Sequence, residues 1–171
     1  MGSAEMDETA TVFSSLTGDP TCVLRGHTAP ITCIAIAGRL VLTGSKDRSA
    51  RLFDIETGRQ VKVFKSHRAP ITSVALSHNG IRALTGSVDH TACVWNVATG
   101  RLIIELGASE EKETKFSVAL GRKIETSKGH TTKVLAVALS HDGSLALTGS
   151  ADATARCVVV HFWPCAIRHT R

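Results

Sequence analysis

The chain has 171 residues, of which 43% are hydrophobic and 20% are charged, and its formal net charge is +5. This composition is typical of a globular protein that buries a core, and it excludes a disordered chain. The first 20 residues lack the apolar core of a secretion signal, and no uninterrupted apolar stretch reaches membrane-spanning length, so the sequence argues against secretion and membrane insertion.

The net charge and the cysteines indicate which partners and which cellular compartment suit the protein. The excess of Lys and Arg over Asp and Glu favours acidic or nucleic-acid partners, although a modest excess is more often a solvated surface. The five cysteines are odd in number, and three of them lie in apolar, strand-like runs, as buried free thiols do. We therefore expect an intracellular protein of the cytoplasm or the nucleus.

One phrase recurs along the chain. VLTGSKDRSARLFDIETG at 41–58 returns as ALTGSVDHTACVWNVATG at 83–100 and as ALTGSADATARCVVV at 146–160, and a fainter copy, GSAEMDETATVFSSLTG, lies at 2–18. The copies align at four aspartates, which are spaced by 40, 42 and 63 residues. A period near 40 with one insertion indicates a structural repeat. The aligned turn residues are Asp7, Asp47, Asp89 and Asp152.

Each repeat unit is predicted to be an antiparallel meander of strands. A polar turn with His precedes a short apolar run in GHTAPITCIAIA at 26–37, SHRAPITSVALS at 66–77 and GHTTKVLAVALS at 129–140. Such runs are typical of strands covered on both faces, and they are too short for buried helices. SHNG at 77–80 and SHDG at 140–143 supply Asn-Gly and Asp-Gly, so we expect two-residue hairpin turns there. In the first unit the expected strands are 31–36, 40–44, 49–53 and 60–64.

These features together resemble the WD40 repeat family. The units carry Gly-His at 26 and 129, TGSxD three times, and Val-Trp-Asn at 94–96. The resemblance covers about residues 2–158 and implies an all-β fold in which each unit is one four-stranded blade of a β-propeller. Family propellers usually close with about seven blades. We therefore predict a WD40-type propeller fragment, an open arc of about three to four four-stranded antiparallel blades.

The repeat alignment divides the chain into six segments. The sequence after the second full unit is about 21 residues longer than the repeat requires, and it includes the acidic run SEEKE, which we interpret as part of a solvated loop. The repeat dissolves after Arg156, so the tail is not expected to complete the last blade. The expected segments are a partial blade with its third and fourth strands at 1–25, WD repeats at 26–65 and 66–104, an inserted acidic loop at 105–128, a truncated WD repeat at 129–158 and a divergent tail at 159–171.

The resemblance implies a hydrogen-bonded tetrad that locks each blade, formed by a His, a strand Thr or Ser, the turn Asp and a Trp. The side chains suit this role, because Trp only donates, Thr donates and accepts, and neutral His accepts with one ring nitrogen while donating with the other. Phe53 and Val158 stand where the first and third units would carry the Trp. The complete tetrad is His67, Thr85, Asp89 and Trp95; the partial sets are His27, Thr43 and Asp47 with Phe53, and His130, Thr148 and Asp152.

No constellation in the sequence indicates catalysis, a cofactor or a metal. A GxxxxGK[ST] phosphate loop is lacking, and the repeat accounts for most of the histidines. Cys157, His161, Cys165 and His169 recur every four residues. On a helix they would spread over about 18 Å at ~1.5 Å per residue, and Pro164 opposes such a helix, so one ion could not meet all four. We predict that the protein is not an enzyme and binds neither metal nor cofactor.

The resemblance implies a rigid platform that holds other proteins or peptides together within a multi-subunit complex. In the family the usual contact positions lie on the narrow rim, three and five residues after the His and immediately before the turn Asp. Transferred to this chain, the expected partner-binding residues are Pro30, Thr32, Lys46, Pro70, Thr72, Val88, Lys133, Leu135 and Ala151.

Two further expectations concern partners. The alternative function is that of a basic RNA-associated subunit of an RNA-processing particle, which the positive charge favours and the aromatic content of 4% disfavours. An open arc also exposes apolar blade faces and unpaired strand edges, so we expect self-association through them.

Overall fold

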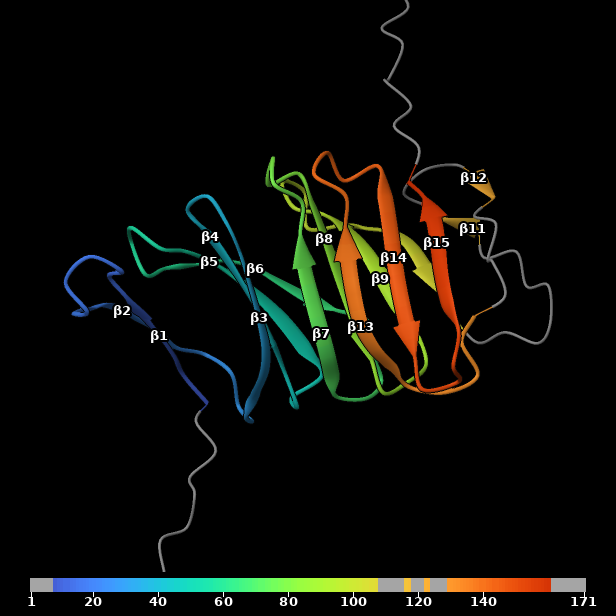
Figure 1. Ribbon diagram of the computed structural model, residues 1–171, viewed down its shortest axis with the longest axis horizontal. Helices are drawn as coiled ribbons and strands as arrows, with labels where there is room; N and C mark the ends of the chain where they lie inside the picture. The colour runs from blue at the N-terminus through green and yellow to red at the C-terminus, as the bar shows by residue number, and fades with distance from the viewer. Residues whose placement is uncertain (1–7, 108–115, 118–121, 124–128, 161–171) are drawn as a thin grey trace, which may run out of the picture.

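The computed structural model describes residues 8–107, 116–117, 122–123 and 129–160, and in these ranges every helix-or-strand element is a β-strand (Figure 1). The strands form separate antiparallel sheets that follow one another from β1 at one end of the molecule to β15 at the other. The sheets do not close into a ring within the described ranges. The expected fold class, an open all-β arc of blades, is therefore confirmed.

The fold begins with a hairpin of two strands, which we call the half-blade. β1 (Ala10–Phe13) pairs with β2 (Pro20–Leu24), and the register places Ala10 opposite Leu24. Both of these residues are buried in a cluster with Val41 and Phe53 of the next sheet. The half-blade is thus held by packing, because a two-stranded hairpin is only marginally stable by itself.

Two complete blades follow, each a four-stranded meander of consecutive strands. Blade 1 consists of β3 (Ile31–Ala37), β4 (Leu40–Ser45), β5 (Ser49–Asp54) and β6 (Gln60–Lys65). Blade 2 consists of β7 (Ile71–Leu76), β8 (Arg82–Ser87), β9 (Ala92–Asn96) and β10 (Leu102–Leu106). The second strands, β4 and β8, are buried along nearly their whole length, and apart from the buried Arg82 at the start of β8 their residues are apolar or small.

Blade 3 has three strands in the described residues, in the order β13 (Val134–Leu139), β14 (Leu145–Ser150) and β15 (Ala155–Val159). Between blades 2 and 3, the short strands β11 (Phe116–Ser117) and β12 (Arg122–Lys123) pair with each other. Among the described strands, the last strand of blade 3, β15, is therefore an edge strand that pairs with β14.

The turn between β7 and β8 differs from the expected two-residue hairpin. β7 ends at Leu76 and β8 begins at Arg82, so the connection is longer. Asn79 acts through its side chain, since its Oδ1 accepts a hydrogen bond of 3.0 Å from the N–H of Ile81. The left-handed conformation belongs to Gly80, with φ of +67°. The two-residue prediction was wrong because Asn and Asp side chains compete with the backbone for hydrogen bonds.

The predicted insertion at 105–128 differs from a plain loop at two places. β10 continues through Leu106, so the first two residues of the segment belong to blade 2. The pairing of β11 with β12 then places a short hairpin inside the segment. The acidic run at 109–113 lies outside the described residues.

The predicted tail at 159–171 begins two residues too early. β15 includes Val159, and the N–H of Val160 donates to the carbonyl of Ser144 at 2.7 Å. Val160 is buried against blade 2, because its apolar side chain continues the core between blades 2 and 3. The rest of the tail lies outside the described residues.

Neighbouring blades pack through apolar faces that approach closely at two glycines. A Cβ on Gly44 would lie 2.6 Å from Ile71 Cγ2, and a Cβ on Gly86 would lie 2.7 Å from Val134 Cγ1. Only a glycine admits the first strand of the next blade at such distances. The core between blades 1 and 2 includes Leu42, Leu52, Phe64, Ile71 and Trp95, and that between blades 2 and 3 includes Leu84, Val94, Leu106, Ala146 and Val160.

Candidate functional site

A chain of hydrogen bonds crosses blade 2. His67, in the loop before β7, has Nδ1 3.1 Å from Asp89 Oδ2 and Nε2 2.8 Å from Thr85 Oγ1. Trp95 on β9 donates from Nε1 to the same Thr85 oxygen at 3.0 Å. The structure therefore brings together the four residues of the tetrad that the resemblance implied.

The hydrogen bonds of this tetrad all donate in one direction, from Trp95 toward Asp89. An ionised carboxylate only accepts, so the imidazole proton lies on Nδ1 of His67, and Nε2 accepts from the Thr85 hydroxyl. The Thr85 oxygen in turn accepts from the indole of Trp95. Because the bond to Asp89 is charge-assisted and each bond polarises the next, the chain fixes the loop, the turn and two strands in one geometry.

Blade 1 has the same arrangement without the indole. His27 Nδ1 lies 2.7 Å from Asp47 Oδ2, and its Nε2 lies 2.8 Å from Thr43 Oγ1. Phe53 at the Trp position is 1% exposed and packs in the cluster that the half-blade covers. Apolar burial takes the place of the indole donor in this blade.

Blade 3 is the least enclosed of the three. His130 Nδ1 lies 3.0 Å from Asp152 Oδ2, and its Nε2 lies 2.9 Å from Thr148 Oγ1. Val158 at the Trp position is half-buried. The hydrogen bonds of the His, Thr and Asp are thus kept while the packing around them thins toward the end of the arc.

Sequence reasoning missed one member of each network, a Ser or Thr two residues after the Asp. Its hydroxyl donates to the Asp Oδ1 at 2.6 Å in all three blades, and its backbone N–H donates to the same oxygen. The recurrence of DRS, DHT and DAT in the aligned turns is the signal that could have revealed it. The missed residues are Ser49, Thr91 and Thr154.

These bonds also stabilise an unfavourable backbone conformation. The residue after each Asp has a positive φ: +70° at Arg48, +68° at His90 and +61° at Ala153. Residues with a Cβ avoid this left-handed region. The Asp side chain offsets the cost, because it closes the turn by accepting from the residue on the far side of the strained position.

The networks keep the three aspartates ionised. Burial raises the pKa of the Asp47 carboxyl, but its hydrogen bonds, from Ser49 first and then from His27, outweigh burial and lower the pKa to about 2. Burial likewise opposes the hydrogen bonds at Asp89, which hold its pKa well below the usual range. The hydrogen bond from the neighbouring threonine is the largest cause of the lowered pKa of Asp152.

The histidines of the networks are not placed for acid–base catalysis. Their side chains are between 1% and 3% exposed, and both ring nitrogens of each are within hydrogen-bond distance of a partner. A general base must reach a substrate proton with an unoccupied atom. The role of these three histidines, His27, His67 and His130, is therefore to stabilise the fold.

The described ranges hold neither a metal-binding cluster nor a membrane-spanning helix. Within them, no group of three or more His, Cys, Asp or Glu side chains could hold a metal ion. Of the four tail residues that recur every four positions, Cys157 is described and exposed, and the others lie outside the described residues. The same ranges contain no helix that is long and apolar enough to cross a membrane.

The structure places six of the expected partner-binding residues in three pairs on one rim. In each pair the residue before the turn Asp donates its backbone N–H to the carbonyl of the residue three positions after the His. The pairs are Lys46 to Pro30 at 2.9 Å, Val88 to Pro70 at 3.0 Å and Ala151 to Lys133 at 3.2 Å.

The other three expected positions divide into two kinds. Thr32 Oγ1 donates to the carbonyl of Ile71 at 2.5 Å, and Thr72 Oγ1 donates to the carbonyl of Val134 at 2.5 Å. Both hydroxyls thus tie the first strand of one blade to the first strand of the next. Leu135, at the same position of blade 3, has no hydroxyl and is 50% exposed.

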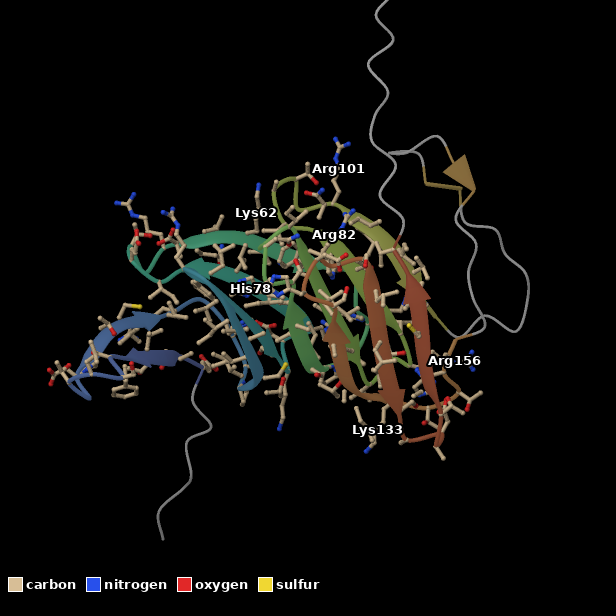
Figure 2. The ribbon with its side chains drawn as sticks, turned by 45° about the horizontal axis from the view of Figure 1, so that its top comes forward. Lys62, His78, Arg82, Arg101, Lys133 and Arg156 are labelled. Carbon is tan, nitrogen blue, oxygen red and sulfur yellow. The ribbon has the colours of Figure 1, made fainter. Side chains whose placement is uncertain are left out.

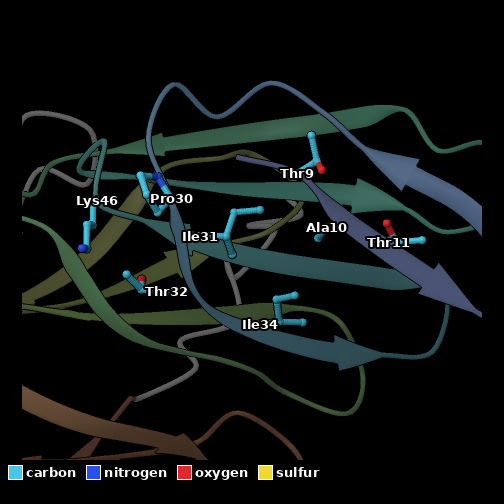
Figure 3. Close-up of a pocket in the computed structure, with 8 residues that line it drawn as sticks. All are labelled: Thr9, Ala10, Thr11, Pro30, Ile31, Thr32, Ile34 and Lys46. Carbon is cyan, nitrogen blue, oxygen red and sulfur yellow. The ribbon is translucent and has the colours of Figure 1, made fainter. Parts of the chain in front are cut away.

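A hollow of about 480 Å³ lies where the half-blade faces blade 1 (Figure 3). Ala10 and its two chain neighbours line one side, and Pro30, Thr32, Ile34 and Lys46 line the other. Three expected partner-binding positions therefore border this hollow.

Comparison with known proteins supports the description of the fold. A family model described as WD domain, G-beta repeat matches residues 18–54, 58–96 and 121–158. The chain is also similar to a solved structure titled "Structure of U3-55K", with a TM-score of 0.71 and 19% identity, over 89% of this chain and 42% of that chain. At this identity the likeness shows the fold alone, and the chain spans less than half of that protein. The search of curated proteins found no match.

We expect Trp95→Phe to lower the free energy of unfolding by about 1–3 kcal/mol, because the buried Thr85 oxygen loses its donor and the ring shrinks. Chemical denaturation measures the change. Thr85→Val is the partner variant, since Trp95→Phe should cost less in that background if the hydrogen bond carries the effect. An unchanged unfolding midpoint for Trp95→Phe would contradict the role of the tetrad.

Acid should destabilise the fold. The folded pKa of Asp47 is about 2 and its ordinary value is 3.8, so the stability that its ionised form contributes is present above pH 3.8 and is lost as pH falls toward 2. The lowered pKa values of Asp89 and Asp152 act with the same sign. Urea unfolding midpoints at falling pH measure the loss. Asp47→Asn should flatten part of the dependence, and a midpoint that rises with acid would refute the assignment.

Proposed function

Because the chain belongs to the WD40 repeat family (WD domain, G-beta repeat), we propose that it is a non-catalytic scaffold that binds other proteins or peptides within a larger complex. The family generally serves as such a platform. The free thiols of Cys22, Cys33, Cys93 and Cys157 support a reducing, intracellular setting in the cytoplasm or the nucleus.

The observation that supports this proposal best is the row of three backbone-paired positions on one rim. Each pair lies directly beside a His–Asp network, so its backbone is held before any partner arrives. A surface that is already ordered loses little conformational entropy on binding. The rim is therefore suited to rigid recognition of a short segment.

The side chains of the rim define the partner chemistry. Lys46 and Lys133 are exposed cations, and between them lie exposed apolar groups, of which Leu135 is 50% and Val88 is 37% exposed. Cations attract carboxylates, while an apolar group gains from covering exposed aliphatic surface. A peptide with an acidic residue beside an apolar anchor fits this surface best.

The test uses one variant on this rim, Lys46→Glu with Lys133→Glu and Leu135→Asp. We expect it to lose binding to arrayed peptides that carry an acidic residue next to an apolar one, because two attractions become repulsions and the anchor contact is lost. Circular dichroism should stay unchanged, since all three side chains are exposed.

A matched control makes the same charge changes, two cations to Glu and one aliphatic residue to Asp, on the opposite rim: Lys62→Glu with Arg101→Glu and Ile81→Asp. Figure 2 places Lys62 and Arg101 at the opposite side of the molecule from Lys133. The control should bind the acidic peptides as the parent does. Equal binding by both variants would place the protein interface elsewhere.

A second candidate function is that of an RNA-associated subunit. Lys62 and Arg101 lie on the rim opposite Lys133 (Figure 2), Arg101 is exposed and Lys62 is half-buried, and cations on one side of a molecule can contact phosphates. RNA binding that weakens with salt and is lost in the Lys62, Arg101 and Ile81 variant, but kept in the Lys46, Lys133 and Leu135 variant, would favour this candidate over peptide binding.

A further inference from the structure

The two contacts between blades inside the chain follow one rule. The first strand of a blade inserts two β-branched side chains against a glycine on the second strand of the blade before it. At Gly86 the distances from an added Cβ to the nearest methyl carbons of the two valines would be 2.7 and 2.8 Å. The matching sets are Ile71 and Val74 against Gly44, and Val134 and Val137 against Gly86.

Blade 3 carries the same receiving surface with nothing described upon it. Gly149 follows Leu-Thr as Gly44 and Gly86 do, yet no described atom lies within 4 Å of a Cβ added there. Leu147, two residues earlier, is 48% exposed, whereas its equivalents Leu42 and Leu84 are completely buried. We call this surface, with Leu147, Gly149 and Cys157, the receiving face.

Blade 1 carries the opposite half of the contact, and the half-blade covers it only in part, since Ile31 packs against the cluster of Ala10 and Phe53. Ile34 pairs with Thr43 as Val74 pairs with Thr85, so Ile34 and Val74 are equivalent positions. Ile34 is nevertheless 50% exposed while Val74 is 7% exposed, and Ile36 is 62% exposed. We call this surface, with Ile31, Ile34 and Ile36, the inserting face.

We propose that a second copy of this chain joins these surfaces, with the inserting face of one copy bound to the receiving face of the other. This joint rests on the scaffold function proposed above, and its occupant is the self-association partner that the sequence led us to expect. It continues the interface that the chain already forms twice internally, with the same residue types in the same register. The residues that define the two faces are all uncharged, and Lys46 borders the inserting face, since it lines the same hollow as Ile31 and Ile34.

The head-to-tail direction follows from the chemistry of the two faces. If two receiving faces met, the Gly149 residues of both copies would face each other with no side chain to fill the space between them. If two inserting faces met, the Ile34 side chains would have no glycine to pack on. Only unlike faces repeat the internal contact. Such a heterologous contact leaves one free face at each end of a pair, so longer assemblies form as the concentration rises.

The joint is weaker than the internal contacts for two reasons. Thr32 and Thr72 donate to the carbonyl of the next first strand, and Leu135 in blade 3 has no hydroxyl to do so. In addition, Ala10 of β1 already packs against blade 1 at the position that Ala155 of the other copy's β15 would occupy. Either β1 or β15 must therefore be displaced before the two copies can join. We therefore expect reversible, concentration-dependent association.

The test uses one variant for each face of the full chain. Gly149→Val fills the receiving face and meets no described atom within the same chain, and Ile34→Asp places a charge on the inserting face. In analytical ultracentrifugation the parent should rise above 18.1 kDa with concentration, while each variant alone stays at 18.1 kDa. An equal mixture of the two variants should form a species of roughly twice that mass and no larger, because one good joint remains.

Controls separate this joint from misfolding and from the rim. Val61→Asp, at an apolar position on β6 that is 46% exposed, should associate as the parent does, and Ile36→Asp replaces Ile34→Asp if the latter fails to fold by circular dichroism. The variant with Lys46→Glu, Lys133→Glu and Leu135→Asp tests peptide binding alone. The proposed scaffold function can therefore fail in that assay without any effect on the test of the joint. A monomeric parent, variants that associate like the parent, or a mixture that stays at 18.1 kDa would each overturn the proposal.

Discussion

The fold depends on the hydrogen bond between a buried histidine and the aspartate of the turn between the second and third strands. In blade 1 this bond is 2.7 Å long, and the same carboxylate also accepts from Thr28 and Ser49. It joins the loop that enters a blade to the turn at the same end, and it holds a left-handed residue in place. The rim that we assign to partners is the surface of this joined loop and turn.

A second constraint acts between blades. Close packing at Gly44 and Gly86, together with the hydroxyls of Thr32 and Thr72, fixes each blade on the next. In such a repeat architecture each unit contacts only its neighbours, so among the described residues Ile34 of blade 1 and Leu147 of blade 3 stay half exposed where their equivalents in the interior are buried. The rim and the end faces therefore arise from different interactions, one within blades and one between them, and they meet at the hollow beside blade 1, which Lys46 and Ile34 both line.

The three blades show how one network tolerates different surroundings. Blade 2 extends it with Trp95, blade 1 encloses it with Phe53, and blade 3 leaves Val158 half-buried beside it. The hydrogen bonds of the His, Thr and Asp persist in all three. The side chains within a blade thus determine the hydrogen bonds of the network, while the neighbouring blade determines how deeply the network is buried.

The sequence by itself determined the strands and the network residues, because both repeat with period and spacing. The strand expected at 31–36 is β3 at Ile31–Ala37, and His27, Thr43 and Asp47 meet as their side-chain chemistry allows. Only the tertiary structure decided how deeply residues that are identical in the repeats are buried. The Leu-Thr-Gly-Ser segments of β4, β8 and β14 are the same in sequence, but the next blade covers the first two, whereas no described atom lies within 4 Å of a Cβ added at Gly149. A face is buried only where another blade stands beside it.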